Sequence, residues 1–349
     1  MNQTPAVEHV DLPFAPSDDF VAWTAGGDLA LVDGATGAIR QNVGAEGGAI
    51  ERDLAWDPWG DRVIAYEGGE DDSGEITVYP IRRVKQSVEL GARSHLAWVD
   101  GRARLLPTPH GAVVFEEGYG VRWKLLGGLP TASVIAPPPA SAWLTVDDEG
   151  ATIHSFGYAD GALERCAAAV GVGGIADPSV QPLDVTAATL PPSARLVPAP
   201  APGDALLVDV SGGSLVVRLV SGGAAGPASL VPLPAAGMRV EAAVPLRGGR
   251  LVAVLLSGDA AAVAVAAVDP GGVVSGAAHL VLPGEVVAAP RFFARVLAAL
   301  GDSDVLAATS AGVHAVRVTD GATGVHLALA PGFAGSELRG PIAALDPAP

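Results

Sequence analysis

The phrase Asp-Gly-Ala-Thr-Gly spans residues 33–37 and returns at residues 320–324. Each copy lies between two short runs in which apolar and polar residues alternate, as they do in half-buried strands. An aspartate side chain accepts hydrogen bonds from a turn backbone, and glycine supplies a positive φ, so the phrase predicts a hairpin turn. The same hairpin near both ends of the chain predicts a repeated all-β architecture that closes into a ring.

The clearest repeat unit runs from Asp53 to Leu90. Asp57-Pro58-Trp59-Gly60 turns the chain there, and four short strands are predicted at residues 54–56, 63–66, 76–79 and 87–90. Four antiparallel strands in about 40 residues have the size of one blade of a β-propeller, in which blades repeat around a central channel. The unit therefore predicts a propeller.

The second strand of this unit can be followed around the chain. Its predicted copies are at residues 20–23, 63–66, 112–115, 142–145, 205–209, 251–255 and 305–308. A third strand follows nearly every copy, at residues 29–32, 121–125, 151–155, 214–220, 262–268 and 313–318. We therefore predict seven four-stranded blades in a single domain over residues 1–349, and six or eight blades remain alternatives.

The two ends of the chain are predicted to share one blade. The N-terminal unit lacks a convincing first strand, whereas residues 341–347 read like residues 54–58, an innermost strand that ends in Asp-Pro. Closure by this strand removes exposed sheet edges, and it places the two Asp-Gly-Ala-Thr-Gly turns in adjacent blades. Residues 1–17 are expected to form an extended arm.

A proline-, alanine- and serine-rich stretch covers residues 178–202. Residues 185–189 are predicted to form an innermost strand before a loop. A linker between two domains is the alternative interpretation of this stretch.

Two segments carry a resemblance to known propeller families. Residues 54–66 resemble the inner-strand, turn and second-strand phrase of WD40-like and TolB-type β-propellers, and residues 31–39 are similar to a hairpin of quinoprotein-like propellers. The Gly-His start and Trp-Asp end of WD40 repeats are absent, and Arg40-Gln41 stands where quinoprotein repeats have tryptophan. The resemblance implies propeller architecture for most of the chain.

Composition and charge argue against several classes of partner. The formal net charge is −17 and the chain has only two lysines, which disfavours nucleic acid and anionic membrane surfaces. A single cysteine, Cys166, excludes an internal disulfide and is expected to pack as a small hydrophobic residue. The N-terminal residues lack a secretion signal, so we expect a cytoplasmic protein, or a periplasmic or surface protein if a leader has been removed.

No local motif predicts a catalytic, cofactor-binding or metal-binding residue. The seven histidines are scattered, and His154 and His314 are expected on corresponding third strands as packed blade residues. The acidic groups at residues 70–75 and 147–150 are interpreted as solvated hairpin tips. Neither a Gly-x-Ser-x-Gly elbow nor a phosphate-binding Gly-x-x-x-x-Gly-Lys-Ser/Thr loop occurs.

Aromatic and arginine side chains indicate a surface for a protein partner. These residue types are common anchors at protein interfaces, and packing between blades is the alternative for both aromatic pairs. The candidate interaction surface comprises Trp56, Trp59, Arg291, Phe292, Phe293 and Arg295.

These observations favour a non-enzymatic interaction scaffold or assembly subunit with a protein partner and no cofactor. The alternative is a propeller hydrolase or lactonase that uses channel-facing carboxylates and a divalent metal ion. Acids or histidines that converge on the channel would favour the enzyme, and a plugged apolar channel would favour the scaffold.

Overall fold

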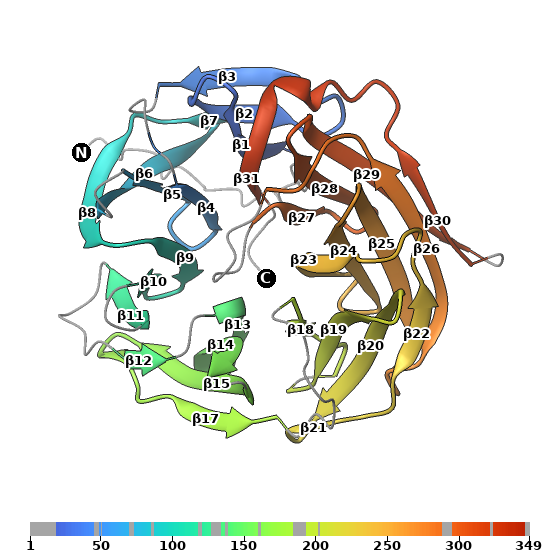
Figure 1. The fold of residues 1–349 in the computed structure, drawn as a ribbon. Coiled ribbons are helices and arrows are strands. Elements are labelled where there is room, and N and C mark those ends of the chain that lie inside the picture. The colour runs from blue at the N-terminus through green and yellow to red at the C-terminus, as the bar shows by residue number, and fades with distance from the viewer. Residues whose placement is uncertain are drawn as a thin grey trace, which may run out of the picture.

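Seven antiparallel sheets surround a central axis in a computed structural model of the protein (Figure 1). The structure describes residues 19–44, 49, 51–69, 73–84, 87–117, 121–126, 134–136, 139–159, 162–183, 193–201, 203–287, 295–321 and 324–345. The predicted seven-bladed β-propeller is confirmed. The expected N-terminal arm lies outside the described residues.

Each blade contributes one strand to the inside of the ring. The innermost strands are β31 (Leu338–Ala344), β4 (Glu51–Asp57), β9 (Ala103–Thr108), β13 (Pro139–Asp147), β18 (Arg195–Pro198), β23 (Arg239–Leu246) and β27 (Leu297–Leu300). We number the blades 1 to 7 in this order, so that blade 1 holds both β31 and the first strands of the chain.

The other strands follow outward from the axis. The second strands are β1 (Asp19–Thr24), β5 (Arg62–Gly68), β10 (Gly111–Glu117), β14 (Gly150–Ala159), β19 (Ala205–Ser211), β24 (Leu251–Ser257) and β28 (Asp304–Thr309). The third strands are β2 (Leu29–Asp33), β6 (Ser73–Val84), β11 (Val121–Leu126), β15 (Ala162–Gly171), β20 (Ser214–Ser221), β25 (Ala261–Val268) and β29 (Gly312–Gly321).

The outer edges vary more than the inner strands. Blades 2, 4 and 5 each divide the edge between two short segments that pair with the same third strand. The outer strands are β3 (Ile39–Val43), β7 (Ser87–Leu90) with β8 (Ser94–Asp100), β12 (Val134–Ala136), β16 (Gly174–Ile175) with β17 (Ser179–Pro182), β21 (Ala224–Ala225) with β22 (Ser229–Pro232), β26 (Val274–Leu282) and β30 (Gly324–Leu329).

One blade differs from the sequence prediction. Six of the seven predicted second strands hold that position, but residues 142–145 belong to the innermost strand β13, and residues 151–155 belong to the second strand β14. Radial position depends on pairing: β13 pairs with β14 alone, through Trp143 and His154 among others. Within residues 178–202, β17 and β18 are described, whereas the predicted strand at 185–189 lies outside the described residues.

The C-terminal strand closes the ring as predicted. β31 pairs antiparallel with β1, with Val21 opposite Ala343, and the Leu345 amide donates to the Asp19 carbonyl oxygen at 3.0 Å. A short 3₁₀ turn, η1 (Gly335–Glu337), precedes β31. Ala334 lies immediately before this turn, and its amide donates to the Thr36 carbonyl oxygen at 2.7 Å. The C-terminal segment therefore also contacts the β2–β3 turn.

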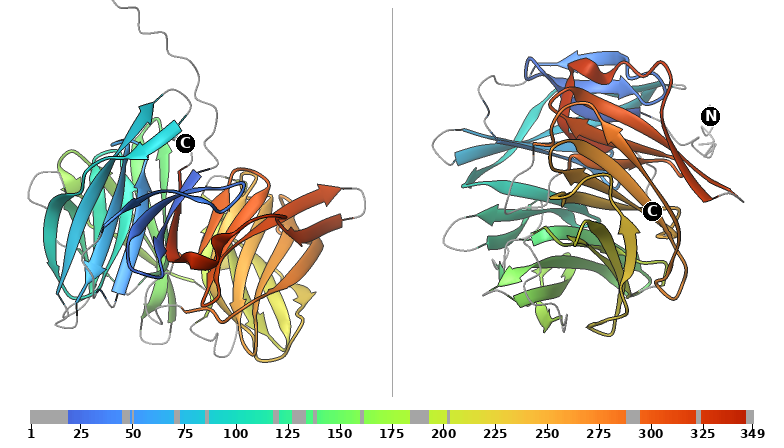
Figure 2. Two further views of the ribbon diagram at one scale, coloured as in Figure 1. Left: turned by 90° about the horizontal axis from the view of Figure 1, so that it is seen from above. Right: turned by 45° about the vertical axis from the view of Figure 1, so that its right-hand side comes forward.

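The two Asp-Gly-Ala-Thr-Gly turns lie in blades 1 and 7, which are adjacent, as predicted. In the first copy, Asp33 Oδ1 accepts the amides of Ala35 and Thr36, both at 3.0 Å. Gly37 has a φ of +69°, and a Cβ there would lie 2.9 Å from the Ala334 nitrogen. The second copy belongs to the β29–β30 hairpin, drawn in red, which projects beyond the ring (Figure 2).

The core lies between neighbouring blades. Blades 6, 7 and 1 share a cluster of alanine, valine, leucine and isoleucine side chains with Phe20 as its one fully buried aromatic residue. Blades 1 to 4 bury much larger side chains, among them Trp23, Tyr66, Phe115 and Trp123. Cys166 is buried in the cluster between blades 3 and 4, as expected. Within the described ranges, no helix has the length and apolar character that a membrane crossing requires.

Candidate functional site: the central channel

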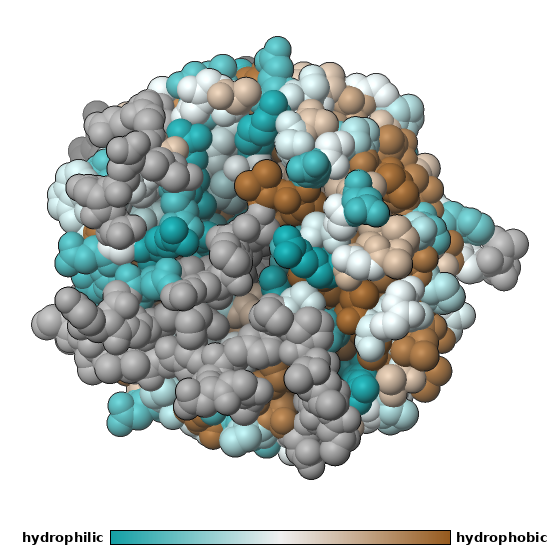
Figure 3. Space-filling view, viewed as in Figure 1, coloured by the Kyte–Doolittle hydropathy of each residue, from teal (hydrophilic) through white to brown (hydrophobic). Residues whose placement is uncertain are grey.

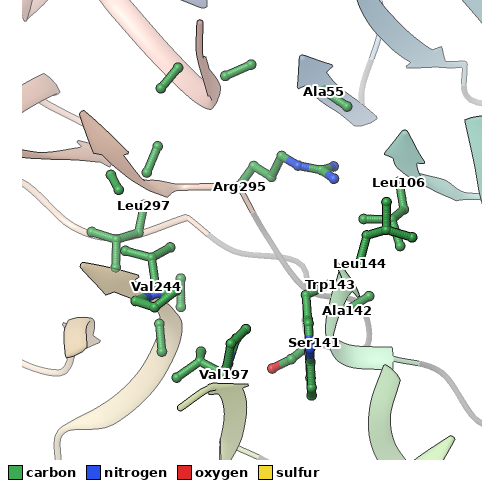
Figure 4. A pocket seen from close by; sticks show the side chains of 18 of the residues that line it. Ala55, Leu106, Ser141, Ala142, Trp143, Leu144, Val197, Val244, Arg295 and Leu297 are labelled. Carbon is green, nitrogen blue, oxygen red and sulfur yellow. The ribbon is translucent and has the colours of Figure 1, made fainter. Parts of the chain in front are cut away.

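The seven innermost strands enclose a cavity of about 510 Å³ on the propeller axis (Figure 4). Every blade contributes to its wall, because each inner strand presents its free edge to the axis. A volume between about 300 and 1,000 Å³ is usual for small-molecule sites. The size of the cavity is therefore compatible with a small-molecule site.

Small apolar side chains dominate the wall. Of the 27 described residues that line it, 23 are alanine, valine, leucine, isoleucine, proline or tryptophan. Since alanine carries only a methyl group, alanines at these positions leave the axis hollow where larger side chains would fill it. The lining alanines are Ala55, Ala140, Ala142, Ala242, Ala243, Ala298, Ala299, Ala343 and Ala344.

Charged side chains gather where the inner strands begin. We call these residues the charged collar: Glu51, Asp53, Arg104, Arg195, Glu241 and Arg295. Each occupies one of the first three positions of an inner strand or, for Arg295, precedes β27. Equivalent strands of a propeller run in the same direction along the axis, so the collar surrounds one end of the channel.

Arg295 reaches across the channel from blade 7. Figure 4 shows its side chain extended toward Ala55 and Leu106 on the opposite side. Its Nη1 lies 2.5 Å from Asp53 Oδ2, and its Nη2 donates to the Leu105 carbonyl oxygen. Asp53 is 1% exposed, so the guanidinium supplies the compensation that a buried carboxylate requires.

The other collar side chains also have polar partners. Arg104 Nη2 lies 3.0 Å from Glu51 Oε1, and Glu241 Oε1 lies 2.7 Å from the Nε of Arg239. Arg195 Nη1 donates to the carbonyl oxygens of Ser193 and Ala194, just before its strand, and its Nε donates to the Glu241 carbonyl oxygen. Glu241 is the one carboxylate among the described wall residues, and its Oε1 also accepts from the Ser257 hydroxyl. The collar carboxylates are thus held by arginine and serine donors.

The described part of the predicted interaction surface lies at the channel. Trp56, Trp59 and Arg295 all contribute to the cavity wall, and Trp59 is 37% exposed. Arg291, Phe292 and Phe293 lie outside the described residues. Trp56 is half-buried, and the Arg83 guanidinium carbon is 5.9 Å from its ring centre.

Sequence reasoning missed three wall residues, Trp143, Arg195 and Glu241. The sequence does not predict Trp143 as a wall residue, because its apolar pattern places residues 142–145 on a second strand, which does not face the axis. Its ring stacks on His154 with centroids 5.3 Å apart, and Thr145 Oγ1 lies 2.9 Å from His154 Nε2. Burial, and then the charge of Arg165, lower the pKa of His154 to about 4, so that this neutral ring supports Trp143.

The histidines predicted as packed blade residues do not line the cavity. His314 lies on a third strand as predicted, with its Nε2 3.0 Å from Thr309 Oγ1, and burial lowers its pKa. His154 lies instead on the second strand β14, so the expected correspondence was wrong. Among the described residues, no group of three or more histidine, cysteine, aspartate or glutamate side chains is placed to hold a metal ion.

The two acidic groups behave differently. Asp147 Oδ1 accepts the amides of Glu149 and Gly150, at 2.9 and 3.1 Å, which makes residues 147–150 the tip of the β13–β14 hairpin. Residues 70–72 lie outside the described part of the chain. Glu75, the last member of that group, is held by Arg93 at 2.5 Å and by His95 at 2.9 Å.

Comparison with known proteins supports the architecture. No family model and no curated protein matches the sequence, so the WD40-like and TolB-type resemblance stays a prediction. The structure is similar to a functionally unknown protein from Desulfotomaculum acetoxidans, with a TM-score of 0.63, 14% identity and coverage of 95% of this chain and 99% of that one. It is also similar to a candidate 6-phosphogluconolactonase from Bacteroides uniformis, with a TM-score of 0.62, 12% identity and coverage of 93% and 99%.

A hypothetical selenium-binding protein from Sulfolobus tokodaii has the same architecture, with a TM-score of 0.59, 11% identity and coverage of 94% of this chain and 93% of that one. Identities this low establish the common fold alone. Function must therefore be argued from the residues of this chain.

Proposed function

We propose that the protein is a non-enzymatic interaction scaffold that binds another protein at the outer rim of its ring. The observation that carries the proposal is that five of the seven blades have a large, well-exposed apolar side chain on a described outer strand. We call these five the rim residues: Trp98, Val180, Leu230, Val281 and Leu329.

Three rim residues belong to consecutive blades. Leu230 lies on β22, Val281 on β26 and Leu329 on β30, and these side chains are 64%, 51% and 46% exposed. Figure 3 shows hydrophobic residues along the right-hand side of the ring, where blades 5 to 7 lie. Contiguous exposed apolar patches mark protein-binding sites, and β26 lies beside both β22 and β30 in space.

The channel is hollow rather than plugged, but the chemistry of its wall argues against the hydrolase alternative. Its described wall is mainly apolar, and the collar carboxylates already accept from arginine and serine side chains. A hydrolase that used channel carboxylates would have to detach them from these donors first. The acidic net charge of −17 further favours a partner with basic groups around its apolar contact.

A rim variant tests the proposal directly. We expect Leu230→Glu/Val281→Glu/Leu329→Glu to lose the partner, because each change places a charge where an apolar contact forms. The measurement is quantitative affinity capture from cells that make the protein, with captured proteins identified by mass spectrometry. The wild type should enrich the same partner reproducibly, and the rim variant should retain less than a tenth of it, a loss of about 1.4 kcal/mol or more.

The matched control adds three charges on the same edge without removing a rim residue. Ser275→Glu/His279→Glu/Ala328→Glu places them at exposed positions of β26 and β30 and should retain the partner. Equal capture by wild type and rim variant would overturn the rim as the binding surface. Turnover of a sugar lactone by the wild type that is lost in Glu241→Gln would instead favour the hydrolase alternative.

A further inference from the structure

We propose that the central cavity binds a small, neutral, largely apolar molecule. The inference goes beyond the scaffold proposal and does not depend on it, since the cavity and the rim residues lie at opposite ends of each blade. It rests on the wall around the cavity, the chemistry of that wall and the pairing of its charges.

A wall on all sides of the axis distinguishes this cavity from a flat apolar face. All seven inner strands wall it, so a bound molecule would be surrounded on every side of the axis. Arg295 crosses its collar end, and Trp59, the residue that follows Asp57-Pro58 at the end of β4, is partly exposed. We place the entrance at the Trp59 end, because inner strands run from the collar toward it.

The backbone of the wall is also depleted of donors. Pro107, Pro198 and Pro245 lie on three inner strands, and all three line the cavity. An inner strand has a partner on one edge only, and a proline within it occupies a position whose amide would face the open edge. Since proline has no N–H group, these positions present no donor to the cavity. The open edges that face the cavity thus lack a donor at these three positions.

Charge pairing selects a neutral molecule. Three of the described wall residues are charged. Glu241 and Arg295 are paired with Arg239 and Asp53 respectively, and the buried Arg195 already donates to the carbonyl oxygens of Ser193, Ala194 and Glu241. An anion or cation that entered would lose its hydration and would have to compete with these existing partners, which is costly in an apolar site. Aromatic surface from Trp56 and Trp143 suits a ligand with a ring or a hydrocarbon body.

Two dyes of one scaffold test the inference. N-phenyl-1-naphthylamine is neutral, and 1-anilinonaphthalene-8-sulfonate is a similar molecule that carries a sulfonate. We expect the neutral dye to bind one molecule per chain, at least tenfold more tightly than the sulfonate, since tenfold corresponds to about 1.4 kcal/mol and charge desolvation exceeds that. Fluorescence titration measures both affinities.

Cavity-filling variants locate the bound dye. In Ala142→Leu/Ala299→Leu an isobutyl group replaces a methyl group on opposite parts of the wall, and affinity for the neutral dye should fall at least tenfold. Ala328→Leu, at an exposed position of β30, is the control and should bind as the wild type does. If the double variant does not fold, Val244→Thr keeps nearly the same shape, adds a hydroxyl to the wall and should weaken binding severalfold.

Two outcomes would overturn the proposal. Equal affinity for the two dyes would show that the site does not select neutral molecules. Binding that survives both wall variants, or that involves several dyes per chain, would place the dye on the outer surface. An unchanged partner capture in Ala142→Leu/Ala299→Leu would leave the scaffold proposal intact, so the two proposals fail separately.

Discussion

Blades 1 to 3 and blades 5 to 7 have the same order of strands from the axis outward, but they bury different side chains. The first group buries Trp23, Tyr66, Tyr79 and Trp123, whereas the second buries alanine, valine and leucine almost exclusively. Nine of the ten buried side-chain atoms without a hydrogen-bond partner among the described residues lie between residues 23 and 123; the tenth belongs to Asp209. The aromatic blades thus enclose polar atoms that the aliphatic blades avoid.

The difference shows that blade geometry depends on strand pairing more than on side-chain type. A large aromatic residue brings a hydroxyl or an indole N–H into the interface, and that group needs a partner. Alanine and valine bring none, but each buries less area, so many of them must share the stabilisation. We therefore expect truncations to be costly at few positions in blades 1 to 3 and moderately costly at many positions in blades 5 to 7.

The largest expected effect is in the aromatic blades. Phe115 is fully buried and meets Trp123 edge to face, with ring centroids 5.3 Å apart. Phe115→Ala should lower the free energy of unfolding by about 3–5 kcal/mol, whereas Val263→Ala in blade 6 should lower it by about 2 kcal/mol, because fewer buried groups are removed. Urea denaturation measures both values, and equal losses would contradict the comparison.

The Arg295–Asp53 pair joins the two groups of blades. Arg295→Ala should cost about 3 kcal/mol, the lower end for removing one partner of a buried pair, since the Arg295 side chain is 19% exposed. Arg317→Ala breaks the more exposed Arg317–Asp304 pair and should change stability by less than about 1 kcal/mol. Arg295→Met/Asp53→Leu should recover most of the loss. A loss that persists in this double variant would show that the pair does more than neutralise a buried charge.

A pH-dependent effect is expected at blade 4, where the two groups of blades meet. The unfolded chain binds a proton at His154 near pH 6.5, but the folded protein does so only near pH 4. The free energy of unfolding should therefore fall as the pH falls through this window. His154→Gln should flatten the fall, and His279→Gln, an exposed control on β26, should not. Denaturation midpoints between pH 4 and 7 provide the test.

The smallest effect concerns two buried tyrosines of blade 2. The Tyr66 hydroxyl donates to the Gly101 carbonyl oxygen at 2.8 Å, so Tyr66→Phe should cost about 1 kcal/mol. The Tyr79 hydroxyl is buried near the Thr77 hydroxyl without a hydrogen bond of normal geometry, and burial raises its pKa. Tyr79→Phe should therefore stabilise the protein by up to about 1 kcal/mol. Opposite signs in thermal unfolding would confirm the cost of unpaired groups in the aromatic blades.

The sequence predicted the repeat better than the radial place of each strand. Short apolar runs and turn residues identify hairpins locally, so the strand at 63–66 and the closing strand near Ile342 were correctly placed. Residues 142–145 were misplaced because an inner and a second strand have similar apolar patterns. Only long-range pairing distinguishes them.

The charged collar could not be predicted for the same reason. Asp53 and Arg295 are 242 residues apart in sequence and meet only when the ring is closed. Nothing in the residues around Glu241 indicates that Arg239 and Ser257 will hold it. Trp56 and Trp59 were recognised as unusual, but their place beside the channel follows from the position of β4 at the inner edge of blade 2.

Closure by β31 has a consequence for synthesis of the chain. A ribosome delivers β1 first, but the strand that covers its inner edge lies more than 300 residues later. Until then, blade 1 keeps an unpaired edge, the feature through which nascent chains pair with wrong partners. The risk of misassembly is thus greatest at the inner edge of β1, before β31 has been synthesised. A synthetic peptide with the sequence of residues 338–344, supplied during translation, would occupy that edge and compete with the chain's own last strand.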